Sequence, residues 1–140
     1  MNIFKTTLIT LSLFTAFSVH AQTNETFNDT DWRVISFLMG NGIVSDQYTE
    51  KMTVNFNQGR VSGLAVCNNF NGTYRLNAKK QIRISPLSSS MAHCGSEEAM
   101  NEEVAFMKAW NGITSYQIQG NIMTLKDKAG RTRVQLSATE

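Results

Sequence analysis

The chain has 140 residues, of which 41% are hydrophobic, and it carries 13 Lys or Arg against 11 Asp or Glu. A length of this order fits one domain with a hydrophobic core. The net charge of +2 is too small for the basic excess that marks nucleic-acid-binding domains, so we expect no nucleic-acid partner.

Residues 1–21 have the pattern of a secretory signal peptide. Lys5 is followed by an uncharged apolar run, and Val19 and Ala21 fit the small-residue positions before a cleavage site. The run is short for a membrane span, which needs about 20 apolar residues. We therefore predict cleavage after Ala21 and a soluble exported protein, periplasmic or secreted. No cysteine at the cleavage point can accept a lipid, and no later segment is long enough to span a membrane.

The polar segment that follows, residues 22–29, is predicted to be a flexible lead. Residues 30–140 are then expected to form a single domain. Within it, short alternating runs separated by turns predict about eight antiparallel strands. These runs are 31–38, 51–56, 60–67, 70–76, 81–85, 115–118, 122–125 and 131–136.

One helix is predicted between the fifth and sixth runs. Ser96 is a good N-cap, acidic residues follow it in the first turn, and Asn111-Gly112 ends the pattern. An apolar stripe should face the sheet, with other residues turned away from it. The stripe contains Ala99, Phe106, Trp110 and Ile113, widened by Met100, Val104 and Met107, whereas Asn101, Glu102 and Lys108 lie outside it.

Glu103 is the one acidic residue inside this apolar arc. A carboxyl group at the rim of the helix–sheet contact, paired with an arginine, is the favoured interpretation. A catalytic acid of raised pKa is the alternative.

Many half-buried strands and one helix must share one core. A strongly curved antiparallel sheet, closing toward a lipocalin-like barrel with the helix packed on it, meets this requirement. A sandwich of two sheets is the alternative.

Cys67 and Cys94 are the only cysteines, and His93 is the only histidine after the predicted cleavage site. These three residues are too few for a structural zinc site, which takes about four ligands. A Cys-His nucleophile usually draws its partners from separate elements, unlike adjacent His93 and Cys94. In an exported domain an even cysteine count favours a disulfide, here worth roughly 3.6 kcal/mol by chain entropy. We therefore predict a Cys67–Cys94 bond, no catalytic residues, no metal and no cofactor.

Several motifs together resemble the META domain family, which includes HslJ-like heat-inducible envelope proteins. The run "GRVSGLAVCNNFNGTYRL" is followed by "ISPLSSSMAHC", "EEVAF" and "SYQIQGNIMTL". Two positions depart from the family pattern, with Val66 where Gly is frequent and Ser90 where Thr is frequent. Many HslJ-like members are lipoproteins, but this chain lacks the lipid-accepting cysteine.

The resemblance covers about residues 30–137 and implies a β-rich lipocalin-like barrel with a helix. It implies no established reaction, and the family is associated with heat or envelope stress, drug tolerance and virulence in some parasites. We therefore expect a non-catalytic, monomeric binding module whose partner is a protein or envelope component. The alternatives are a carrier of a small apolar ligand in the barrel interior and a Cys- or His-dependent enzyme.

Overall fold

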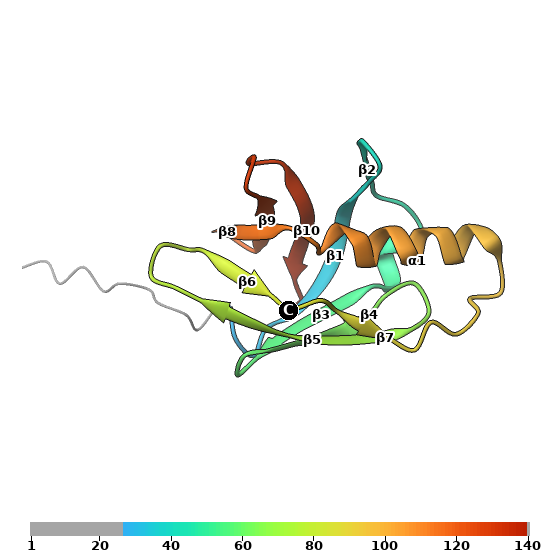
Figure 1. The fold of residues 1–140 in the computed structure, drawn as a ribbon, viewed down its shortest axis with the longest axis horizontal. Coiled ribbons are helices and arrows are strands. Elements are labelled where there is room, and N and C mark those ends of the chain that lie inside the picture. The colour runs from blue at the N-terminus through green and yellow to red at the C-terminus, as the bar shows by residue number, and fades with distance from the viewer. Residues whose placement is uncertain (1–26, 140) are drawn as a thin grey trace, which may run out of the picture.

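The computed structural model describes residues 27–139 (Figure 1). The predicted signal peptide and most of the predicted lead lie outside these residues. Residues 27–139 fold into ten strands, one α-helix and one short 3₁₀-helix. In chain order they are β1 (Asp31–Met39), β2 (Gly42–Val44), η1 (Thr49–Lys51), β3 (Thr53–Asn57), β4 (Arg60–Leu64), β5 (Asn69–Leu76), β6 (Ile82–Ile84), β7 (Ser88–Ser89), α1 (Glu97–Ala109), β8 (Ile113–Gln119), β9 (Ile122–Asp127) and β10 (Thr132–Ala138).

Eight strands form one continuous antiparallel path in the order β6-β5-β4-β3-β1-β10-β9-β8, while β2 pairs with β1 and β7 with β5. The two ends of this path meet, because Gln81 bridges Ser115 and the Tyr116 amide donates to the Lys80 carbonyl at 3.1 Å. The sheet is therefore nearly closed into a barrel. This result confirms the predicted barrel and excludes the two-sheet sandwich.

Two glycines explain why the β3–β4 hairpin forms where it does. Gln58 and Gly59 both have positive φ, 47° and 80°, as the tightest hairpin turns require. Gly63 lies against the backbone of β3, and a Cβ atom there would be 1.9 Å from the Thr53 carbonyl oxygen. Any other residue at position 63 would force these two strands apart.

The barrel interior is filled mainly by aromatic side chains. Phe106 and Trp110 of α1 contact Phe70, with ring centroids 5.7 and 5.9 Å away, and Trp110 also contacts Phe56 at 6.2 Å. Trp32 is fully buried. Helix α1 therefore covers the barrel and adds its aromatic stripe to the same core.

Phe27, which the sequence analysis assigned to the flexible lead, belongs to this core. It is 2% exposed and packs against Phe56, Tyr74 and Tyr116, with centroid distances of 4.6, 5.4 and 4.9 Å. The packed domain therefore begins before residue 30, because one aromatic of the polar lead inserts between the strands.

Both ends of α1 are capped by polar groups. The Ser96 hydroxyl accepts the Ala99 amide at 3.1 Å, which confirms the predicted N-cap. At the other end, the Arg133 guanidinium donates to the Lys108 and Ala109 carbonyls at 3.1 and 3.0 Å. A cation at this end also complements the helix dipole. The described helices include none that is long and apolar enough to cross a membrane.

Candidate functional site

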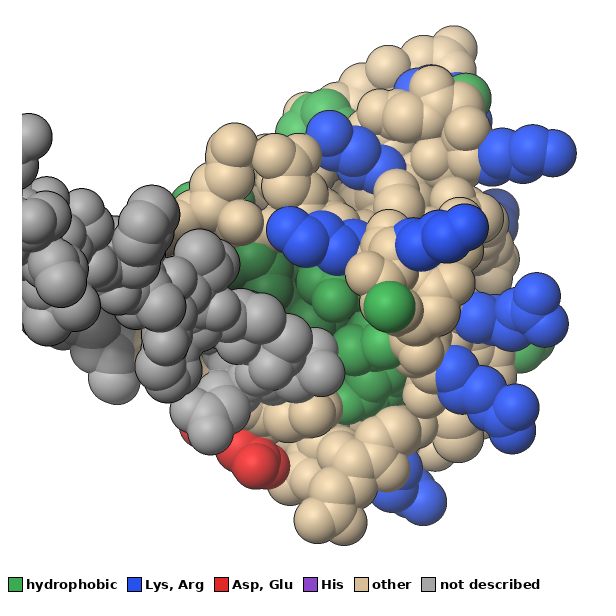
Figure 2. Space-filling view, turned by 90° about the vertical axis from the view of Figure 1, so that its left-hand side faces the viewer, with side chains coloured by type: hydrophobic (Ala, Val, Ile, Leu, Met, Phe, Trp, Pro, Cys, Tyr) green, Lys and Arg blue, Asp and Glu red, His purple; other side chains and the backbone are tan. Residues whose placement is uncertain are grey.

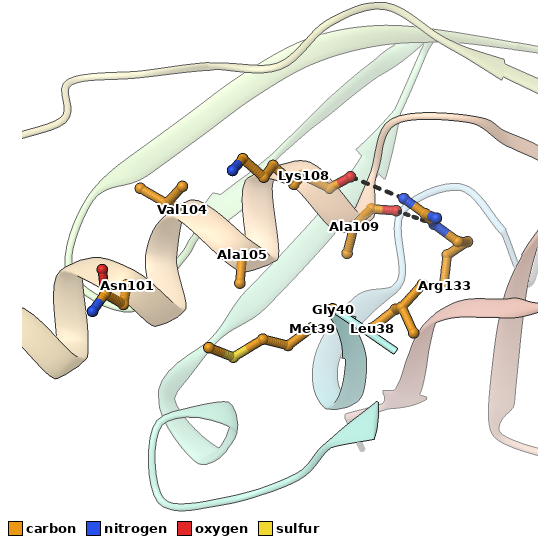
Figure 3. Close-up of a pocket in the computed structure, with 9 residues that line it drawn as sticks. All are labelled: Leu38, Met39, Gly40, Asn101, Val104, Ala105, Lys108, Ala109 and Arg133. Atoms are coloured by element: carbon orange, nitrogen blue, oxygen red, sulfur yellow. Dashed lines mark hydrogen bonds between the residues drawn. The ribbon is translucent and has the colours of Figure 1, made fainter. Parts of the chain in front are cut away.

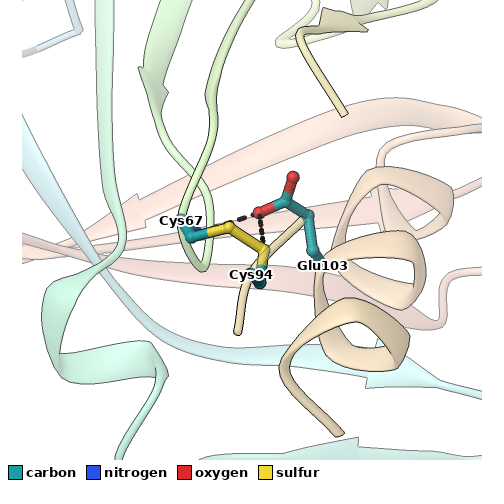
Figure 4. Close-up of side chains that lie close together, drawn as sticks. All are labelled: Cys67, Cys94 and Glu103. Carbon is teal, nitrogen blue, oxygen red and sulfur yellow. Dashed lines mark hydrogen bonds between the residues drawn. A yellow bond between two sulfur atoms is a disulfide. The ribbon is translucent and has the colours of Figure 1, made fainter. Parts of the chain in front are cut away.

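The two cysteines meet beside the helix, next to Glu103 (Figure 4). Cys67 lies between β4 and β5, and Cys94 lies just before α1. The structure joins them in a disulfide with a Cα–Cα distance of 5.6 Å, as predicted, and leaves no free cysteine in the described part of the chain. The bond ties the irregular segment before the helix to the sheet.

Glu103 is fully buried directly beneath this disulfide. Its Oε2 accepts the backbone amides of Cys67 and Asn68 at 2.9 and 3.1 Å and lies 3.5 Å from the Cys94 sulfur. The predicted arginine partner is therefore wrong. Backbone amides of the β4–β5 connection take its place, because that loop turns its N–H groups inward toward the helix.

Asn68 completes this buried polar cluster and is 4% exposed. Its side-chain amide donates to Glu103 Oε1 and to the Ala92 carbonyl, and its oxygen accepts the Ala92 amide at 3.0 Å and the Ser90 hydroxyl at 2.6 Å. Ser90, one of the departures from the family pattern, thus still supplies a hydroxyl to the cluster. The sequence analysis did not identify Asn68 as part of a site, because a loop asparagine carries no signal of burial.

The cluster does not suit a metal ion or a nucleophile while the disulfide is intact. The Cys67 and Cys94 sulfurs and a Glu103 oxygen lie within 4.8 Å of one another, but the sulfurs are bonded to each other. A cysteine binds a metal or acts as a nucleophile in its thiolate form, and the disulfide leaves neither Cys67 nor Cys94 as a thiolate. His93 is exposed and takes no part in the hydrogen bonds of the cluster. What the arrangement does is hold two loops and the helix together.

A partly open groove of about 510 Å³ lies between α1 and the end of β1 (Figure 3). Leu38, Met39, Val104 and Ala105 form its apolar part, and the charged groups beside it are Lys108 and Arg133. Arg133 is already engaged with the helix carbonyls. Lys108 is exposed and is the charge that a ligand in this groove would meet first.

Glu102 is a second buried acidic residue of α1. Only 7% of it is exposed, although it lies outside the apolar stripe of the helix. The reason is that Asp46, in the segment between β2 and η1, approaches the other side of the helix. Burial, together with a hydrogen bond to Asp46 and the charges of Asp46 and Glu98, raises the pKa of Glu102 to about 7.

We expect this carboxyl group to make stability depend on pH. Its folded-state pKa lies above its ordinary value of 4.5, so the folded protein binds more protons between about pH 4.5 and 7. The free energy of unfolding should fall as pH rises through this window. We expect a fall of about 1–2 kcal/mol, less than the full pKa shift would give, because nearby water screens the charge. Urea denaturation at pH 5 and pH 8 measures the difference.

The matched variants are Glu102→Gln and Glu97→Gln, the latter at an exposed position of the same helix. The first should lose most of the decline between pH 5 and pH 8, and the second should keep it. A decline that persists unchanged in Glu102→Gln would assign the titration to another group.

The face of the molecule shown in Figure 2 carries many basic side chains and few acidic ones. Residues 51–96 contain no Asp or Glu, and this stretch includes the whole β5–β6 hairpin. Along the described chain the ion pairs are those of Asp127 with Arg131, at 2.9 Å, and with Arg133, at 3.8 Å. The cations of the β5–β6 hairpin therefore have no acidic partner among the described residues.

A nearly closed, eight-strand antiparallel barrel, covered by one helix and cross-linked by one disulfide, defines this protein as a small β-barrel domain. It belongs to the META domain family, whose model matches residues 25–140.

Solved structures with a similar fold include a DUF4847 family protein from Bacteroides vulgatus ATCC 8482. It is 19% identical with a TM-score of 0.56, and the match covers 81% of this chain and 94% of that one. An NMR structure matches at 18% identity, with a TM-score of 0.56 and coverage of 81% and 92%. These similarities concern the fold alone. Comparison with curated protein sequences gives no match.

Proposed function

We propose that this protein is an exported, non-catalytic META domain that acts as a stress-associated binding module of the cell envelope. The observation that carries the proposal is the filled barrel. Side chains as large as Trp32, Phe56, Phe70 and Phe106 are at most 1% exposed and occupy the interior where a lipocalin-like carrier would hold its ligand. A binding partner must then contact the outer surface of the barrel.

The chemistry of the cysteine cluster supports the same proposal. Cys67 and Cys94 are bonded to each other in the disulfide, and the Glu103 oxygens accept hydrogen bonds from three protein N–H groups. A general acid or base must be able to reach a substrate proton. The Glu103 carboxyl group is fully buried and is occupied by structural hydrogen bonds.

Complementation of a deletion strain tests this function. Because a binding module needs no general base, His93→Ala should restore the phenotype of the deletion strain fully. Cys67→Ser combined with Cys94→Ser should do the same once the amount of folded protein is matched, since loss of a disulfide lowers abundance. Phenotype is scored under heat and envelope stress, with protein levels measured by immunoblot.

If His93→Ala accumulates normally as folded protein but fails to complement, the non-catalytic proposal is wrong. A Cys- or His-dependent enzyme would then be the leading alternative.

The groove beside α1 favours a second candidate, carriage of a small ligand on the outside of the barrel. Its apolar part and the exposed Lys108 ammonium suit a carboxylate with a short apolar tail. Displacement of a fluorescent fatty acid tests this candidate, with Lys108→Gln expected to weaken binding. If no carboxylate displaces the fluorescent fatty acid, whatever its tail length, the second candidate is wrong.

A further inference from the structure

The outer surface of the β5–β6 hairpin and the adjacent strands carries a continuous set of cations, here called the basic face. It comprises Arg60, Arg75, Lys79, Lys80, Arg83 and Lys126. All are exposed except Lys126, which is half-buried. Figure 2 shows basic side chains around an apolar hollow on this side of the molecule, with acidic side chains scarce.

Strand register brings these cations together. Arg75 and Arg83 lie directly opposite each other in the β5–β6 pair. One row along the sheet, Gln81 bridges Ser115, and Ser115 pairs with Lys126. Arg60 pairs with Thr73, two residues before Arg75. Neighbouring strands lie about 4.8 Å apart, so the charges form an array on one face of the sheet rather than a scattered set.

The Arg75–Arg83 pair is unfavourable for the fold itself. Like charges at directly opposed positions of an antiparallel pair repel, and neither guanidinium forms an ion pair within residues 27–139. A repulsive pair held at the surface is relieved when an anion binds both groups. Guanidinium groups are well suited to phosphate oxygens, to which they donate two parallel hydrogen bonds.

Apolar side chains near the basic face indicate which kind of anionic partner it binds. Leu76 follows Arg75 on β5 and therefore lies on the inner face of the sheet, and Tyr116 donates its backbone amide to the Lys80 carbonyl. Both side chains, with Ile118, are only half-buried although they pack against the core. Cations next to accessible apolar side chains match the interface of a bilayer, where headgroup phosphates lie next to acyl chains.

We propose that the basic face binds the surface of a membrane rich in anionic phospholipid. This inference rests on the proposed envelope function and names the component that is bound. The protein does not enter the bilayer. The arginine pair contacts headgroup phosphates, the lysines of the β5–β6 turn add attraction at longer range, and the half-buried apolar residues face the headgroup–acyl boundary.

Vesicle co-sedimentation of the purified protein tests the inference. Vesicles of phosphatidylcholine alone are compared with vesicles containing about 30% phosphatidylglycerol, at ionic strengths of about 0.1 and 0.5 M. We expect binding to the anionic vesicles only, and loss of that binding at the higher ionic strength. Arg75→Gln combined with Arg83→Gln should weaken binding by about 25-fold, or about fivefold per cation removed.

The control is Lys51→Gln combined with Arg33→Gln, which changes the net charge equally at two exposed positions of η1 and β1. It should weaken binding less than about threefold. Circular dichroism verifies that both double variants are folded, and the arginine variant should be no less stable than the parent because it removes a repulsion. An equal loss of vesicle binding in both double variants would show that binding depends on net charge alone, and would overturn the inference.

Equal binding to neutral vesicles would also overturn it, as would tighter binding to a soluble polyanion such as single-stranded DNA. The vesicle experiment and the complementation experiment can fail independently of each other. If vesicles fail to bind while His93→Ala still complements, only the membrane inference is wrong. If vesicles bind as expected but His93→Ala fails to complement, the non-catalytic proposal fails instead.

Discussion

Replacement of Glu103 by alanine should lower the free energy of unfolding by about 3–5 kcal/mol. The change removes the acceptor of three N–H groups, the backbone amides of Cys67 and Asn68 and the side-chain amide of Asn68. Buried donors left without an acceptor cost about 1–3 kcal/mol each, and the cavity adds to this. Urea denaturation of the oxidised protein, followed by far-ultraviolet circular dichroism, measures the loss.

Two variants give this prediction its controls. Glu103→Gln keeps one carbonyl oxygen for the backbone amides but turns an NH₂ group toward Asn68, so it should cost about half as much. Glu97→Ala removes an exposed carboxyl group from the first turn of the same helix and should cost less than about 1 kcal/mol. A loss below 1 kcal/mol for Glu103→Ala would show that water or a rearranged loop replaces the carboxyl group.

The same carboxyl group should slow reduction of the disulfide. Attack of an external thiol on the exposed Cys67 sulfur expels Cys94 as a thiolate, 3.5 Å from Glu103 Oε2. A polar acceptor at this position offers no hydrogen to the developing negative charge. The buried glutamate thus stabilises both connections between the helix and the sheet. It accepts the hydrogen bonds directly, and it protects the disulfide by disfavouring the departure of Cys94 as a thiolate.

Alternation and caps were enough to predict the barrel, but not its smallest parts. The runs that became β1, β3, β5 and β9 alternate clearly, and the Ser96 cap fixes the start of the helix. β2 and β7 have three and two residues, too few for any periodicity to appear. They exist because β1 and β5 offer unpaired edges to the segments that pass beside them.

The polar interior was predicted less well, and for a different reason. Periodicity identifies the apolar side of a helix but cannot show that a loop such as the one containing Asp46 covers the opposite side. The burial of Glu102 was therefore not predicted. The partners of Glu103 are mostly backbone amides, which every residue carries and no sequence pattern distinguishes. The opposition of Arg75 and Arg83 likewise depends on the register set by a turn.

Replacement of Trp110 by alanine should also cost about 3–5 kcal/mol. Trp110 is the C-cap residue of α1 and is 2% exposed, and its ring contacts Phe56, Phe70 and Phe106 with centroid distances of 6.2, 5.9 and 5.9 Å. Removal of the indole would leave a cavity bordered by three rings from two strands and the helix. Such rings cannot close the space without leaving their rotamers. Urea denaturation followed by circular dichroism measures the effect without relying on tryptophan fluorescence.

The conservative control for this position is Trp110→Phe. The indole N–H of Trp110 has no hydrogen-bond partner, so phenylalanine removes an unsatisfied donor as well as some volume. We expect a loss below about 1.5 kcal/mol, much less than for alanine. Equal losses for the two variants would mean that the indole nitrogen is bonded after all. A loss below 1 kcal/mol for alanine would mean that α1 lifts away from the barrel in solution. The interior would then be open to a ligand, and carriage of a small apolar ligand would become the leading function.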